Sequence, residues 1–193
     1  MKPPRPPPAL TQAVLHEAAL AYLTRGAASA ATLTRTLERR VRNWATRSVR
    51  AGSDPEEVGA AAARAREWVA PIVLRLVEVR LVDDAAFAAQ RADRLTRGGR
   101  SKRAIAAHLK QKGVDGETAR TALAETVDDD LGAALVLARK RRLGPFTRDA
   151  DEGADARRRA LGVLARAGFD FDTAHRALRM SRDEAEERIV ARR

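Results

Sequence analysis

The sequence predicts an all-α protein made of tandem three-helix units that form an elongated, curved array. Three observations predict this fold: helix start and stop signals follow one another closely, no segment alternates with the period of a strand, and parts of the sequence repeat. The composition agrees, because apolar residues make up 45% of the 193 residues while aromatic residues make up only 4%. Much of the apolar fraction is alanine, which favours helix.

Helix signals near the N-terminus predict three helical stretches. Apolar residues at helical spacing indicate a helix over Ala13–Thr24, and Ser29 is a suitable N-cap for a second helix. The segment Ser53-Asp54-Pro55-Glu56-Glu57 combines a capping residue, a first-turn proline and acids near the positive end of the helix dipole. The helix that begins there should continue to about Val79, with a kink or break at Pro71.

The middle of the sequence predicts a compact set of three helices. Asp83-Asp84 should cap a helix that ends at Gly98-Gly99. Ser101 should cap the next helix, which ends at Lys112-Gly113, and Asp115 should cap a short third helix. The spacing of start and stop signals therefore defines one repeating unit.

Internal repetition is the most informative pattern. The segment Leu109–Leu123 aligns without a gap on Leu164–Leu178, and seven of the 15 positions are identical. Each copy ends a helix at glycine, places one apolar residue after it and caps the next helix with aspartate. This offset is 55, whereas Asp83-Asp84 aligns on Asp129-Asp130 at an offset of 46. The difference of nine predicts an insertion in the later copy, in the loop 144–155.

A fainter copy lies nearer the N-terminus. Thr24-Arg25-Gly26 matches Thr96-Arg97-Gly98 at an offset of 72, and Ser29 then matches Ser101. This copy has no glycine after its second helix, so that helix should run on through residues 39–44. The predicted parts are a disordered proline-rich tail at 1–9, a divergent first unit at 10–80, a second unit at 81–126, a third unit at 127–179 and a C-terminal helix or tail at 180–193.

No constellation of catalytic residues emerges from the sequence. His16, His108 and His175 lie in different units, and His16 lacks the second histidine of a helical zinc motif. Asp128-Asp129-Asp130 could collect a divalent ion, but its repeat partner at 83–84 precedes a helix, so N-capping explains both. The sequence has no cysteine for a thiolate site. We therefore expect no enzyme activity, no metal and no cofactor.

The sequence also predicts a cytoplasmic protein. No segment approaches the roughly 18–20 consecutive apolar residues that a membrane span needs. The N-terminal segment lacks the apolar core of a signal peptide, and the absence of cysteine leaves no disulfide framework. We expect no association with membranes.

Basic residues are the remaining functional signal. The net charge of +11 indicates an acidic partner, either nucleic acid or a carboxylate-rich protein surface. Between Arg91 and Lys112, eight basic residues accompany one acid, Asp93, and helical spacing predicts that Arg94 and Arg97 are exposed. The alternative is an ordinary solvated helix face, with part of the later run serving the helix dipole. The predicted partner- or DNA-binding residues are Arg91, Arg94, Arg97, Arg100, Lys102, Arg103, Lys110, Lys112, Arg139, Lys140, Arg141 and Arg142.

Several motifs follow one another along the chain in a characteristic order and spacing. They are Val82-Asp83-Asp84-Ala85-Ala86-Phe87-Ala88, Arg91, Gly98-Gly99-Arg100-Ser101, Ile105, Leu109, Lys112-Gly113-Val114 and Ala122-Leu123, with Asp129-Asp130, Ala134, Ala138-Arg139-Lys140, Leu164, Gly168-Phe169 and Ala177-Leu178 in the last unit. In this order they resemble the RecX family of recombination regulators. The resemblance covers about Ala13 to Leu178 and is densest from Leu81 to Leu123.

The resemblance implies a curved, elongated monomer of tandem three-helix repeats. It implies binding to the RecA recombinase and to its filament on DNA, within the helical groove. Such binding would block filament growth or promote disassembly, and so restrain strand exchange, ATP hydrolysis and the co-protease activity of the SOS response. The first unit departs from the family pattern, in its missing glycine and its long stretch from Arg42 to Arg66. The alternative is a helical DNA-binding protein whose basic faces contact phosphates without a recombinase.

Overall fold

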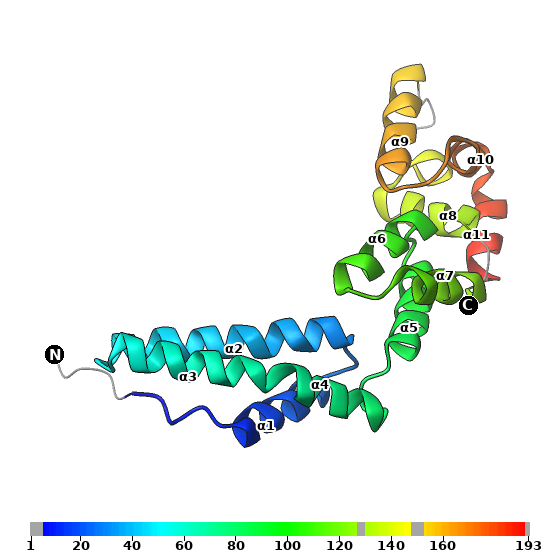
Figure 1. The fold of residues 1–193 in the computed structure, drawn as a ribbon. Coiled ribbons are helices and arrows are strands. Elements are labelled where there is room, and N and C mark those ends of the chain that lie inside the picture. The colour runs from blue at the N-terminus through cyan, green and yellow to red at the C-terminus, as the bar shows by residue number, and fades with distance from the viewer. Residues whose placement is uncertain (1–5, 127–129, 148–152, 192–193) are drawn as a thin grey trace. The chain divides into compact units, whose positions relative to one another are not determined.

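The computed structural model describes residues 6–126, 130–147 and 153–191. Within these ranges the chain forms eleven α-helices and one short 3-10 helix, and no strand (Figure 1). This confirms the predicted all-α class. The chain divides into two compact units, which differ from the three repeating units of the sequence. Unit 1 comprises residues 1–87 and unit 2 comprises residues 88–193.

Unit 1 contains four helices and the start of a fifth. α2 packs along α3 and α4, while α1 packs on α2 and α4 (Figure 1). The predicted break near Pro71 lies slightly earlier, because Pro71 occupies the first turn of α4, where a missing backbone N–H breaks no helical hydrogen bond. The helices are α1 (Gln12–Leu23), α2 (Ala30–Arg50), α3 (Pro55–Glu67) and α4 (Val69–Glu78).

Large aliphatic side chains form the core of unit 1. Leu33, Leu37 and Val41 of α2 are fully buried, and Leu15 of α1 and Leu76 of α4 pack into the same cluster. Their spacing on α2 is one side chain per helical turn, which is the stripe that an amphipathic helix presents to a core. As predicted, α2 runs on through the stretch where the repeat has its glycine.

Unit 2 contains most of α5 and all of the later helices. α8 lies at its centre and packs against α9, α10 and α11. The elements are α5 (Asp84–Arg97), α6 (Lys102–Lys112), α7 (Gly116–Glu125), α8 (Asp130–Arg141), η1 (Gly144–Phe146), α9 (Ala154–Arg166), α10 (Phe171–Arg179) and α11 (Arg182–Val190).

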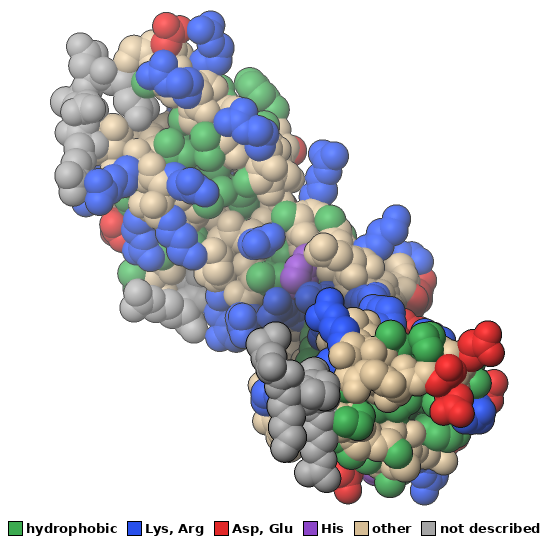
Figure 2. All heavy atoms as spheres, turned by 90° about the vertical axis from the view of Figure 1, so that its left-hand side faces the viewer, with side chains coloured by type: hydrophobic (Ala, Val, Ile, Leu, Met, Phe, Trp, Pro, Cys, Tyr) green, Lys and Arg blue, Asp and Glu red, His purple; other side chains and the backbone are tan. Residues whose placement is uncertain are grey.

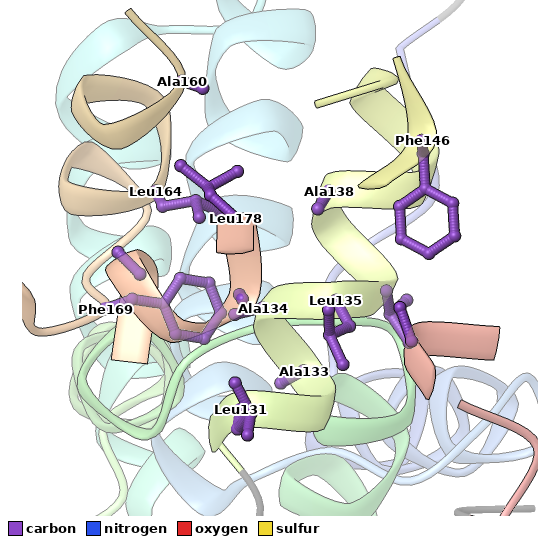
Figure 3. Close-up of a cluster of buried hydrophobic side chains, with 14 of the residues drawn as sticks. Leu131, Ala133, Ala134, Leu135, Ala138, Phe146, Ala160, Leu164, Phe169 and Leu178 are labelled. Atoms are coloured by element: carbon purple, nitrogen blue, oxygen red, sulfur yellow. The ribbon is translucent and has the colours of Figure 1, made fainter. Parts of the chain in front are cut away.

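Alanine makes up seven of the 15 buried residues in the core cluster of unit 2. Ala133, Ala134 and Ala138 of α8 are completely buried, and larger residues such as Phe146 and Phe169 fill the remaining space (Figure 3). Because alanine projects only a methyl group, neighbouring backbones can approach α8 closely. Close backbone packing at α8 is therefore combined with larger side chains in the core of unit 2.

The predicted repeat of caps is present in unit 2. Asp115 Oδ1 accepts hydrogen bonds from the Glu117 and Thr118 N–H groups at 3.0 Å each, and Asp170 Oδ1 accepts one from Thr173 N–H at 2.8 Å. Hydrogen bonds from Thr118 hold the pKa of Asp115 below its ordinary value of 3.8. Hydrogen bonds from Thr173 lower the pKa of Asp170 in the same way.

Some sequence predictions fall outside the described residues. Asp128 and Asp129, residues 1–5 of the proline-rich tail and residues 148–152 of the expected insertion loop are among them. Of that loop, residues 144–146 form η1, and Asp155 already belongs to α9. In the described part of the chain, no helix is both long and apolar enough to cross a membrane.

Candidate partner-binding surface

A hydrogen-bonded joint connects the α5–α6 turn to the helices that follow it in unit 2. Ser101 caps α6 by accepting from Ala104 N–H, and its hydroxyl donates to the Ala167 carbonyl at 2.8 Å. The next N–H, that of Lys102, donates to Asp130 Oδ1 at 3.1 Å. The α5–α6 turn is thus tied both to α8 and to the turn before α10. We call this arrangement the unit 2 joint.

Glycines allow the segments of the unit 2 joint to lie close together. Gly99 has a φ of +84°, and a Cβ built there would lie 2.8 Å from Val136 Cγ1 and 3.1 Å from the Ala133 carbonyl oxygen. A Cβ at Gly168, whose φ is +91°, would lie 2.6 Å from Ser101 Oγ. Both positions therefore need glycine for its backbone conformation and for its lack of a side chain.

An equivalent joint is present in unit 1. Ser29 caps α2 by accepting from Thr32 N–H, and the next N–H, that of Ala30, donates to Asp84 Oδ1 at 2.8 Å. Ala30 and Lys102 are 72 residues apart, and Asp84 and Asp130 are 46 apart, which are the offsets of the sequence repeat. We call this arrangement the unit 1 joint. The sequence repeat therefore corresponds to a repeated long-range hydrogen bond.

The paired aspartates have separate roles. Asp83 caps its own helix by accepting from Ala86 N–H at 2.9 Å, which lowers the pKa of Asp83 below 3.8. Asp84 instead satisfies the otherwise unpaired N–H at the start of α2. The prediction that both residues cap the following helix is therefore correct for Asp83 only, because the carboxylate of Asp84 points to the preceding repeat.

All twelve predicted binding residues lie in unit 2. Half-buried positions are occupied by Arg91, Lys102 and Lys112, and the other nine are exposed. Lys140 Nζ donates to the Gly98 carbonyl at 2.8 Å, so the C-terminal ends of α5 and α8 lie beside each other. The two predicted basic runs therefore adjoin. On the face drawn in Figure 2, Lys and Arg side chains outnumber Asp and Glu side chains.

Several of these cations already have partners in the fold. Arg97 pairs with Asp93 one turn earlier on α5. Arg139 Nη1 lies 3.2 Å from Glu186 Oε2 of α11. Lys140 neutralises the carbonyl end of α5, not that of its own helix. The partners of Arg139 and Lys140 therefore lie on other helices of unit 2, whereas the partner of Arg97 lies on its own helix.

A second group of cations carries no such contacts. Within the described residues, these side chains make no ion pair and no side-chain hydrogen bond, and all are exposed. Each can therefore meet an external anion without losing an internal partner. We call them the open cations of unit 2: Arg94, Arg100, Arg103, Lys110, Arg141 and Arg142.

His108 also belongs to this surface, although it is not one of the twelve predicted binding residues. Arg91 Nε donates to His108 Nε2 at 3.0 Å, across the α5–α6 hairpin. Burial lowers the pKa of His108, and the positive charges of Arg91, Lys112 and Arg100 lower it further. The ring is therefore a neutral acceptor at neutral pH and holds Arg91 in place. Arg91 and His108 lie 17 residues apart on different helices, so no helical spacing in the sequence indicates their contact.

Comparisons with known proteins find similar sequences and a similar fold. The model of the second three-helix domain of RecX matches residues 83–123, which hold α5, α6 and most of α7. The regulatory protein RecX of Agrobacterium fabrum is 40% identical over 110 residues, which are 56% of this chain and 58% of that protein. A crystal structure of RecX from Lactobacillus salivarius has a similar fold, with a TM-score of 0.60, 17% identity, and coverage of 91% of this chain and 97% of that one.

The similarity extends over nearly the whole chain in another relative. The regulatory protein RecX of Myxococcus xanthus is 37% identical over 177 residues, which are 91% of this chain and 89% of that protein. The chain therefore belongs to the RecX family.

Proposed function

We propose that this chain regulates the RecA recombinase, mainly negatively, by binding RecA and its filament on DNA. The regulatory names of its relatives support the class of function. The observation that carries the proposal is the group of open cations in unit 2, which have no carboxylate partner in the described fold. Exposed cations that form no ion pair within the fold favour binding to an acidic macromolecule, because no existing contact is lost on binding.

The filament offers two kinds of anion to this surface. Carboxylates of the recombinase and phosphates of its DNA can both accept charge-assisted hydrogen bonds from guanidinium groups. Binding in the filament groove would limit assembly, strand exchange and the co-protease activity of the SOS response. The chain would act in the cytoplasm, as a monomer, by binding and not by catalysis.

The test of this proposal is a filament assay with the full chain. The purified protein is added to RecA and single-stranded DNA at far less than one copy per recombinase. We expect slower filament growth and lower ATP turnover, because one bound copy interrupts a cooperative array. Filament assembly and ATP turnover that stay unchanged would contradict the proposal.

A charge-reversal pair tests the open cations themselves. Arg94→Glu with Arg103→Glu should abolish filament inhibition without loss of helicity, because both side chains are exposed. The matched control is Arg64→Glu with Arg66→Glu on α3, which changes the net charge equally at exposed positions of unit 1. If the control loses inhibition to the same extent, the effect comes from net charge and the assigned surface is wrong.

The second candidate is a helical DNA-binding protein that needs no recombinase. The same open cations favour it, because exposed guanidinium groups also contact phosphates. Binding to bare DNA would then be tight at physiological salt and would fall steeply as salt rises. A pull-down that recovers DNA but never a recombinase would favour this candidate over the first.

A further inference from the structure

Unit 1 contains a groove that the regulatory proposal does not use. It has a volume of about 630 Å³ and lies between α2, α1 and the segment that precedes α1. This is within the range of sites that hold a ligand of several tens of atoms. Pro7 and Pro8 form one side, Tyr22 of α1 contributes an aromatic ring, and Trp44 of α2 contributes a second.

The lining of the groove is strongly basic. It includes five arginines and no acidic residue, the arginines being Arg25, Arg39, Arg40, Arg47 and Arg50. Within the described residues, none of them forms an ion pair or a side-chain hydrogen bond. The guanidinium of Arg25 lies 5.5 Å from the Tyr22 ring centroid. The groove therefore attracts anions.

The arginines of α2 are spaced so that they repel one another. Arg47 and Arg50 are three residues apart, and Arg40 lies two turns before Arg47 on the same face. Like charges at such spacing destabilise a helix. Of the charged residues of α2, six are arginines and Glu38 is the single acid. An anionic ligand along this face would relieve the repulsion between the arginines. A face exposed only to solvent would not.

The aromatic residues indicate which anion fits. Trp44 Nε1 donates to the Pro8 carbonyl at 2.9 Å, so the ring is held in place with its only donor already used. The ring is half-buried and still lines the groove. Its remaining accessible surface is therefore apolar carbon, which can pack against a nucleobase but cannot contribute a hydrogen bond to a carboxylate.

We propose that this groove binds a single strand of nucleic acid. The arginines would contact successive phosphates along α2, where Arg39 to Arg50 span about 16 Å at 1.5 Å per residue. Trp44 would pack against a base, as aromatic side chains do in sites that bind single strands. In a duplex the bases are paired and stacked, so Trp44 would have no free base face to pack against. The inference does not depend on the recombinase proposal, because its residues all lie in unit 1.

The fluorescence of Trp44 provides a direct test. The chain has two tryptophans, so Trp68→Phe leaves Trp44 as the only one and makes the signal specific to the groove. Titration of this full-length variant with a thymidine oligonucleotide at low salt should quench the fluorescence to saturation. No recombinase is present, so failure here is distinguishable from failure of the regulatory proposal.

A matched pair of neutralising variants tests the arginines. Arg40→Gln with Arg47→Gln should weaken oligonucleotide binding roughly tenfold, and should lower the slope of log affinity against log salt by about 1.4 for two lost phosphate contacts. The control, Arg64→Gln with Arg66→Gln, removes the same charge from exposed positions of α3 outside the groove. It should change affinity by less than about twofold. Equal losses in the two variants would overturn the proposal.

Competing ligands and cross-linking complete the test. A duplex of the same length or polyglutamate that quenches Trp44 as strongly as the single strand would also overturn it. Photo-cross-linking of an oligonucleotide with 4-thiothymine to the unmutated chain does not depend on how any variant folds. Cross-links should map to residues 7–50, which contain the lining of the groove. Cross-links found only in unit 2 would contradict the proposal.

Discussion

The joints of unit 1 and unit 2 share a hydrogen-bonding scheme but differ in packing. In both, a serine caps the second helix and the next N–H donates to an aspartate of the following repeat. A Cβ at Gly99 would collide with α8. The corresponding turn of unit 1 has Gly26, which aligns with Gly98, and Ala27, which aligns with Gly99; a Cβ at Gly26 would meet nothing within 4 Å. The hydrogen bonds therefore define the repeat, and close glycine packing is an addition specific to unit 2.

The two units also present their cations differently. In unit 1, arginines line a groove beside two aromatic rings. In unit 2, the open cations are exposed around a tightly packed joint. This difference suggests different ligands: a flexible single strand of nucleic acid for the groove of unit 1, and a large, preformed surface of a partner for the open cations of unit 2.

The largest effect should come from adding a methyl group at the unit 2 joint. Gly99→Ala should lower the free energy of unfolding by about 3 kcal/mol, because it combines an unfavourable positive φ with overpacking against α8. Gly26→Ala, at a φ of +146° but in open space, should cost only about 1 kcal/mol. Urea unfolding followed by circular dichroism gives both values. Equal losses would mean that close packing at Gly99 is not a separate contribution.

Removing the bridging carboxylates should have a smaller and equal effect in the two joints. Asp84→Ala and Asp130→Ala should each lower the free energy of unfolding by about 1 kcal/mol, since each leaves a helix N–H without its acceptor. Asp84→Asn and Asp130→Asn keep the accepting oxygen and are the matched controls. The same urea measurement applies. If the asparagine variants lose as much as the alanine variants, charge and not the hydrogen bond stabilises the joints.

Gly59 provides a contrast with the glycines of the joints. It lies in α3, and a Cβ there would meet nothing within 4 Å. Gly59→Ala should raise the free energy of unfolding by about 0.7 kcal/mol, because alanine has the better helix propensity. A loss of stability in the urea measurement would show that Gly59 has a packing role that its surroundings do not indicate.

The smallest effect should be a pH dependence caused by His108. Its pKa is lowered in the folded chain, so the unfolded chain binds a proton more readily near the ordinary value of 6.5. The stability contribution of the neutral ring is therefore complete above pH 6.5 and is lost as the pH falls below it. His108→Gln should make stability less dependent on pH between about 7 and 5. Thermal unfolding across that interval measures it, and an unchanged profile in the variant would exclude His108 as the cause.

Local features of the fold could be predicted from the sequence. Ser29, Ser101 and Asp115 cap helices as expected, because a short polar side chain before a helix has few other roles. Gly113 ends α6 in the left-handed conformation for which glycine is suited. The repeat itself was visible because these caps recur at fixed offsets.

The long-range contacts could not be predicted in the same way. The bond from Ala30 to Asp84 joins residues 54 apart, and nothing in either residue's neighbourhood indicates the other. The contact of Arg91 with His108 depends on how two helices face each other. The groove of unit 1 depends on the segment at Pro8 folding back onto Trp44, 36 residues later. Binding residues were predicted by charge alone, which cannot separate Lys140, a packing residue, from Arg141.

The central claim is that the surface of unit 2 carries filament regulation and the groove of unit 1 does not. It is tested most directly by the ATP turnover of RecA on single-stranded DNA, measured with substoichiometric amounts of two variants. We predict that Arg94→Glu with Arg103→Glu no longer inhibits turnover, and that Arg40→Gln with Arg47→Gln inhibits as the unmutated chain does. The reverse pattern, or equal loss of inhibition in both variants, would contradict the claim.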